Sequence, residues 1–125
     1  MIQKYLVAVL MMIASTHVYA EWVEISKGEK ATHYVDLESV KREGNLSSVW
    51  VLADLPKPDE DGIKSVRYLI EIDCGQARTR TISYVAYAGN MAQARVIARN
   101  RLDGGWKNIM PQSLGERQMK FTCAK

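Results

Sequence analysis

Cysteine and arginine side chains are the groups in this sequence with the clearest chemical potential. Cys74 and Cys123 are the only two cysteines in the chain. A thiol redox motif would need Cys-x-x-Cys and a structural zinc site would need four ligands, and the sequence has neither. Two cysteines of one exported chain pair with each other in an oxidising compartment. If the chain is exported, we therefore expect a structural disulfide between Cys74 and Cys123.

The first twenty residues predict that export. The segment MIQKYLVAVLMMIASTHVYA begins with a single basic residue, Lys4, continues with an apolar run, and ends in VYA, a sequence that signal peptidase accepts. Its apolar run is shorter than the roughly 20 residues that span a bilayer. We expect residues 1–20 to be a signal peptide, and residues 21–125 to form one domain without a membrane span.

Arginines gather in one interval of the chain. No acidic residue occurs between Asp73 and Asp103, so the local field there should be positive. If residues 78–87 form a strand, alternation places Arg78, Arg80 and Tyr84 on one face. Arginine with tyrosine suits acidic proteins and anionic polysaccharides, although a set of solvated strand faces is the plainer alternative. The candidate ligand-binding residues are Arg78, Arg80, Tyr84, Arg95, Arg99 and Arg101.

Groups that could support catalysis, metal binding or nucleic-acid binding are scarce. His33 is the only histidine after residue 20, which excludes a multi-histidine metal site within one chain. A Ser-His-Asp triad would have to use His33, yet no Gly-x-Ser-x-Gly elbow accompanies it. Once Lys4 is removed the formal net charge is +2, which requires no nucleic-acid partner. We therefore expect no enzyme, no metal and no cofactor.

Strand patterns dominate the elements that would position these groups. Alternating apolar residues predict strands over residues 21–25, 32–37, 46–55, 63–74 and 78–87. In the fourth strand, alternate residues form a row that faces the core: Val66, Tyr68, Ile70, Ile72 and Cys74. Arg67, Glu71 and Asp73 lie on the opposite side of this strand. Residues 91–101 fit a sixth strand or a short helix, and alternation favours the strand. DLESVKREGN (36–45) indicates a helical turn followed by a Gly44-Asn45 turn.

The end of the chain predicts a helix. In PQSLGERQMKFTCAK (111–125), Ser113 precedes Glu116 by three residues, the spacing of a capping box. Leu114 with Phe121, and Met119 with Cys123, form two adjoining apolar rows from about 114 to 123. The expected fold is α+β: an antiparallel sheet of five to six strands with one C-terminal helix packed on it. Uncovered sheet edges also make a homodimer a reasonable expectation.

The order of several segments resembles the surface-adhesin protein E family of Gram-negative bacteria. The matching pieces are Trp22, YVDLESV (34–40), VWVLADLPKP (49–58), KSVRYLIEIDC (64–74), GGWKNIMPQSLGE (104–116) and FTCAK (121–125). The resemblance implies a sheet with a C-terminal helix tied back by one disulfide. It also implies adhesion, since the best-known members are outer-membrane lipoproteins that bind host matrix proteins such as vitronectin and laminin.

This sequence departs from those lipoproteins at the residue expected to follow the signal peptide. A lipoprotein needs a cysteine there, and the residue is Glu21. We therefore expect a periplasmic or secreted protein rather than a surface-displayed one. The leading hypothesis is an exported, non-enzymatic binding protein of the surface-adhesin E type. A periplasmic envelope or stress-related accessory protein is the alternative, and a small hydrolase is the least favoured.

Overall fold

The computed structural model describes residues 21–125. The predicted signal peptide, residues 1–20, lies outside the described residues. Over the described range, no helix combines the length and the apolar character that a membrane crossing needs.

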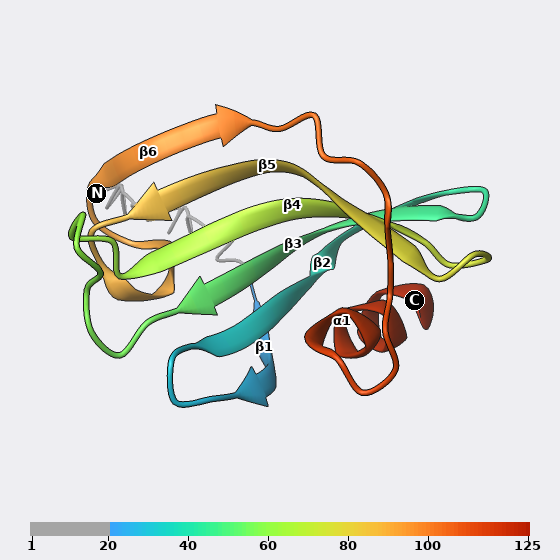
Figure 1. The fold of residues 1–125 in the computed structure, drawn as a ribbon, viewed down its shortest axis with the longest axis horizontal. Helices are drawn as coiled ribbons and strands as arrows, with labels where there is room; N and C mark the ends of the chain where they lie inside the picture. The colour runs from blue at the N-terminus through green and yellow to red at the C-terminus, as the bar shows by residue number, and fades with distance from the viewer. Residues whose placement is uncertain (1–20) are drawn as a thin grey trace, which may run out of the picture.

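Residues 21–125 form a seven-stranded antiparallel sheet with one C-terminal helix (Figure 1). Six strands lie side by side in chain order, and the short seventh strand pairs with the fifth. The predicted α+β class is thus confirmed, with one short strand more than expected. The strands are β1 (Trp22–Lys27), β2 (Thr32–Glu43), β3 (Leu46–Asp54), β4 (Ser65–Asp73), β5 (Arg78–Tyr87), β6 (Val96–Arg101) and β7 (Lys107–Asn108).

The helix α1 (Leu114–Cys123) begins and ends where the sequence places it. The Ser113 hydroxyl accepts a hydrogen bond from the Glu116 amide at 3.2 Å, which satisfies one of the orphan donors of the first turn. The Glu116 carboxylate accepts from the Gln112 amide at 3.2 Å. Its pKa is lowered, chiefly by the hydrogen bond from Lys120 and then by the one from Gln112. The predicted cap is present, with the carboxylate reaching one residue further back than expected.

The core lies between α1 and one face of the sheet. Leu114, Met119 and Cys123 of the helix pack against a buried cluster contributed by β1 to β4. Burying each aliphatic side chain of this kind stabilises the fold by roughly 1.5–3 kcal/mol. The cluster consists of Ile25, Val35, Val49, Val51, Ile70 and Ile72. The predicted core-facing row of β4 is confirmed for Tyr68, Ile70, Ile72 and Cys74, which belong to this core or pack against it, while Val66 at the start of the row is only partly buried and does not.

Phe121 does not join that packing, contrary to the predicted apolar row. Its side chain is 39% exposed, whereas the neighbouring Thr122 is fully buried. Successive helix residues point about 100° apart, so Phe121 and Thr122 cannot both point directly at the sheet. Thr122 takes the buried position, next to the disulfide at Cys123 that ties this end of α1 to the sheet.

Of the two features predicted over residues 36–45, the Gly44-Asn45 turn is confirmed and the helical turn before it is wrong. Strand β2 continues to Glu43, where it pairs with Leu46 of β3 across the predicted turn, and Gly44 adopts φ +60° there. The pairing is interrupted between Asp36 and Lys41, and Leu37 and Val40 within this interruption pack against the core. Cross-strand pairing therefore overrides a weak local pattern.

The ambiguous segment 91–101 is a strand only in its second half. Strand β6 covers Val96–Arg101, as favoured, and a short 3₁₀ segment, η1 (Asn90–Ala92), precedes it. Met91, Ala92 and Ala94 have positive φ, which breaks the alternation on which the strand prediction relied. The Asp54 carboxylate accepts from the Met91 amide at 2.8 Å, and the Ser65 hydroxyl accepts from the Ala92 amide at 2.9 Å. These bonds hold η1 against β3 and β4.

Candidate ligand-binding site

A disulfide joins Cys74, just after β4, to Cys123 at the end of α1. The two Cα atoms lie 6.0 Å apart, and both cysteines pack against the core cluster. The predicted pairing is therefore confirmed. It leaves no thiol for redox or metal chemistry, and it holds the helix on one face of the sheet.

The other face of the sheet gathers arginines. Directly paired residues of neighbouring antiparallel strands share a face, so the rows of partners can be followed across the sheet. One row runs from Trp50 through Leu69 and Ser83 to Arg101. The next runs from Leu52 through Arg67 and Val85 to Arg99. We call this surface the arginine face; its arginines are Arg67, Arg78, Arg80, Arg99 and Arg101.

Tyr84 does not lie on the arginine face, contrary to the predicted alternation. A register shift in β5 leaves Ile82 without a partner, because Ser83 pairs with Leu69 while Thr81 pairs with Ile70. One extra residue in a strand exchanges the faces of all that follow it. Tyr84 consequently pairs with Tyr68 on the helix side. There, burial and then the neighbouring Tyr84 raise the pKa of Tyr68.

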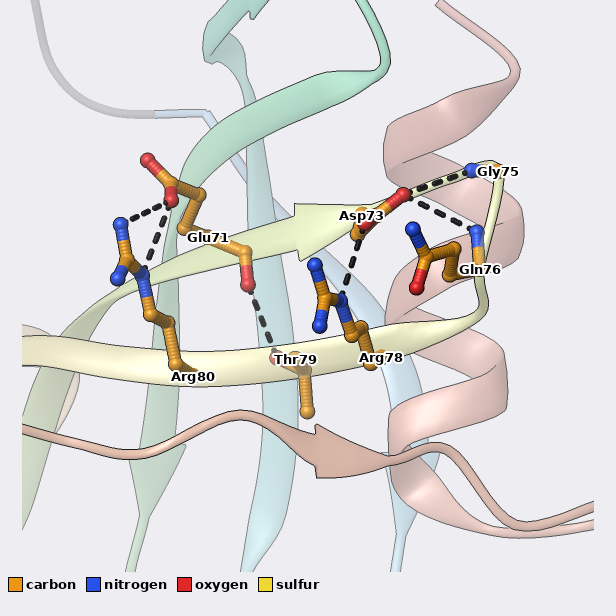
Figure 2. A network of polar contacts seen from close by, with 7 residues as sticks. All are labelled: Glu71, Asp73, Gly75, Gln76, Arg78, Thr79 and Arg80. Carbon is orange, nitrogen blue, oxygen red and sulfur yellow. Dashed lines mark hydrogen bonds and ion pairs between the residues drawn. The ribbon is translucent and has the colours of Figure 1, made fainter.

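Arg78 and Arg80 are held by carboxylates of the adjacent strand (Figure 2). The Arg80 Nε and Nη2 atoms donate to one Glu71 oxygen at 3.0 and 2.6 Å, and Arg78 Nε donates to Asp73 at 3.1 Å. Both arginine side chains stay about one-third exposed, at 33% and 38%. Their charges are therefore largely matched within the sheet.

Asp73 also anchors the β4–β5 turn. Its Oδ1 atom accepts from the amides of Gly75 and Gln76 at 3.1 and 3.0 Å, as Figure 2 shows. The Gln76 amide contributes most to holding the pKa of Asp73 below its ordinary value of 3.8, while the bond and charge of Arg78 and the Gly75 amide act in the same direction.

Tryptophan rings contact three arginines of the face, Arg67, Arg78 and Arg80, which we call the inner arginines. The guanidinium carbons of Arg78 and Arg80 lie 4.6 and 4.5 Å from the ring centre of Trp106, just before β7. Arg67 lies 4.3 Å above Trp50, and its Nε is buried without a hydrogen-bond partner. Each contact is within cation–π range. The sequence analysis did not include Trp106 or Arg67 among the candidate residues. Arg67 could have been included, because strand alternation already placed it on the same side as Glu71 and Asp73.

Arg99 and Arg101 differ from the inner arginines because they are exposed and form no ion pair within residues 21–125. Arg101 borders an open hollow of about 740 Å³, whose lining also includes Arg80, Leu102 and Asp103. The predicted group is therefore brought together only in part. Arg95, also exposed, precedes β6 at the end remote from Arg101.

Other chemistry finds little support in the described part of the chain. No three His, Cys, Asp or Glu side chains of residues 21–125 gather where they could hold a metal ion. His33 pairs with Ala53 between β2 and β3, and burial lowers its pKa from 6.5. Burial thus favours the neutral form of this imidazole.

The sheet order, the C-terminal helix with its disulfide, and the arginine face together define the described part of the chain. The family model of surface-adhesin protein E matches residues 22–124. The chain belongs to the surface-adhesin protein E family.

Solved structures of Haemophilus influenzae protein E have the same fold. The selenomethionine form matches with a TM-score of 0.68 at 16% identity, over 87% of this chain and 90% of that one. Crystal form II matches with a TM-score of 0.65 at 16% identity, over 87% and 91%. A search of curated protein sequences finds no significant match. At this identity, the structural likeness concerns the fold alone.

Proposed function

We propose that this chain is an exported, non-enzymatic binding protein of the surface-adhesin type, and that its arginine face binds an acidic ligand on another molecule. A host matrix protein, another envelope protein or an anionic polysaccharide would supply the required charge. The family membership supports the class of function. The observation that supports the site is the exposure of Arg99 and Arg101 without an ion pair among residues 21–125.

The arrangement of charges supports different roles for the two groups of arginines. Arg78 and Arg80 have carboxylate partners 3.1 and 2.6 Å away, so a ligand would compete with existing ion pairs there. Arg99 and Arg101 keep their full hydrogen-bonding capacity for a ligand carboxylate or sulfate, which a guanidinium binds in bidentate fashion. We therefore assign the primary contact to the β6 pair and a supporting role to Arg80 at the hollow.

Heparin chromatography of site and control variants tests the proposal, with heparin as the anionic probe. We expect Arg99→Ala/Arg101→Ala to elute at clearly lower salt than the wild type, because two of the charges that bind the probe are lost. The control, Lys27→Ala/Lys57→Ala, removes the same charge from exposed positions at the end of β1 and in the β3–β4 loop. It should elute close to the wild type. Equal shifts for both variants would mean that net charge alone governs retention, and would refute the site.

Location in the cell is a separate part of the proposal. An adhesin must face the medium, whereas a periplasmic accessory protein lies behind the outer membrane. Protease treatment of intact cells, followed by immunoblotting, distinguishes these cases. Degradation before cell lysis supports the adhesive role, and protection until the outer membrane is permeabilised supports the periplasmic one.

A further inference from the structure

The outer edge of β6 carries backbone groups that have no partner within residues 21–125. In the sheet order β6 follows β5 and ends the row, since β7 pairs with β5 instead. The Leu102 amide donates to the Ile82 carbonyl at 2.7 Å, so the backbone of Leu102 faces β5. Backbone direction alternates along a strand. The amide and carbonyl groups of Arg99 and Arg101 therefore face away from β5.

The side chains at these two positions are also the exposed arginines of the arginine face. Arg99 pairs with Val85 and Arg101 with Ser83, and both partners lie on that face. A strand added along the edge would place a side chain directly beside each arginine, on the same face. At Arg99 and Arg101, therefore, backbone groups that can pair with an added strand occur together with a positively charged side chain.

We propose that β6 receives an extended acidic segment of a partner protein as an additional antiparallel strand. Acidic side chains at alternating positions of the segment lie opposite Arg99 and Arg101, and its backbone completes the hydrogen bonds of the edge. The inference rests on the proposed function, because it specifies the partner of the same arginine pair. Strand addition of this kind draws its affinity from main-chain bonds and its specificity from alternate side chains.

The same features disfavour other occupants of the edge. A second copy that paired β6 with β6 about a two-fold axis would bring arginines next to arginines, and like charges on paired strands are destabilising. A polysaccharide matches the charge but has no peptide backbone to continue the ladder. The bulge at Ile97, where Ala98 pairs with Ala86 but Val96 pairs with Tyr87, limits regular pairing to Ala98–Arg101. A short, charge-assisted and salt-sensitive contact results.

A backbone-modified peptide tests the inference without altering the protein. The probe is an acetylated, amidated and fluorescently labelled peptide of sequence TETETETET, and its binding is followed by fluorescence anisotropy. In antiparallel pairing, residues opposite Arg99 and Arg101 direct their amides at β6. N-methylation of the glutamates should therefore weaken binding by at least about tenfold, as the loss of two backbone hydrogen bonds implies. N-methylation of the threonines makes the same covalent change on the solvent side and should leave binding unchanged.

Protein variants complete the design. Arg99→Glu/Arg101→Glu should abolish binding of the unmodified peptide, while Lys27→Glu/Lys57→Glu should retain most of it. Equal binding of the two methylated peptides would overturn strand addition. If heparin retention still depended on Arg99 and Arg101, the proposed function would survive that result. A wild-type dimer that the peptide dissociates, detected by light scattering, would assign the edge to a second copy and also overturn the inference.

Discussion

Asp73 connects three parts of the β4–β5 hairpin through one carboxylate. It accepts from the amides of Gly75 and Gln76 and from the Arg78 guanidinium. All three bonds favour the ionised form, which is why the pKa of Asp73 is lowered. Replacement by asparagine preserves the shape of the side chain but removes the charge that strengthens these bonds.

We expect Asp73→Asn to lower the free energy of unfolding near neutral pH. Because the folded-state pKa of Asp73 lies below its ordinary value of 3.8, its contribution is fully present above that value and is lost as the pH falls through the folded pKa. The difference between wild type and variant should therefore shrink below about pH 4. Urea unfolding of both proteins from pH 7 to pH 2.5 measures this. A difference that stays constant over the range would show that the charge of Asp73 is not responsible.

At the residue scale, the sequence predicted what depends on chemical type and missed what depends on neighbours. Two cysteines in an exported chain have one possible pairing, so Cys74–Cys123 followed directly. The Glu71 and Asp73 partners of Arg78 and Arg80 depend on the register of one hairpin. The interval without acidic residues therefore led us to expect too much positive charge at Arg78 and Arg80. Their acidic partners lie on the neighbouring strand β4 and not within that interval.

At the scale of elements, the segment from Leu102 to Trp106 determines how the chain returns from β6 to α1. Figure 1 shows it running from the end of β6 past β5 towards the helix. At Gly104 it approaches β5 so closely that a Cβ atom would lie 2.5 Å from the Thr81 carbonyl oxygen. Gly105, the next residue, has open space where its Cβ would be.

These two glycines form a matched pair for mutation. We expect Gly104→Ala to lower the free energy of unfolding by about 1–3 kcal/mol, because the segment must move away from β5. Gly105→Ala should stay within about 0.5 kcal/mol of the wild type. Chemical denaturation of both variants measures the difference. Similar unfolding free energies for the two variants would show that the segment can move away from β5 without loss of stability.

Local periodicity predicted most of the elements, but not the irregularities between them. The strands from 46–55 to 78–87 and the helix at 114–123 have strong alternation or a cap, and all occur. The bulge at Ile82, which turns Tyr84 to the helix side, leaves no signal in the alternating sequence RTRTISYVAY. A bulge is determined by how two strands and their neighbours fit, and that information is spread over distant parts of the chain.

At the scale of the whole molecule, the disulfide closes a loop with a sequence separation of 49 residues. We expect Cys74→Ala/Cys123→Ala to lose about 4 kcal/mol of unfolding free energy, chiefly through the greater freedom of the unfolded chain in the entropic model. Unfolding of wild type and variant in urea, under non-reducing conditions, measures this. As a control, adding reductant should leave the variant unchanged and bring the wild type towards it.

The position of that bond also determines how the molecule would respond to being pulled by its ends. Tension applied at the C-terminus passes from Cys123 directly to Cys74, beside β4, and continues through β3 and β2 towards β1. The loop between the two cysteines contains β5, β6, β7 and nearly all of α1, and it cannot lengthen while the bond is intact. Arg99 and Arg101 thus lie in a mechanically shielded part of the chain, and we expect this part to keep its shape while the first strands separate.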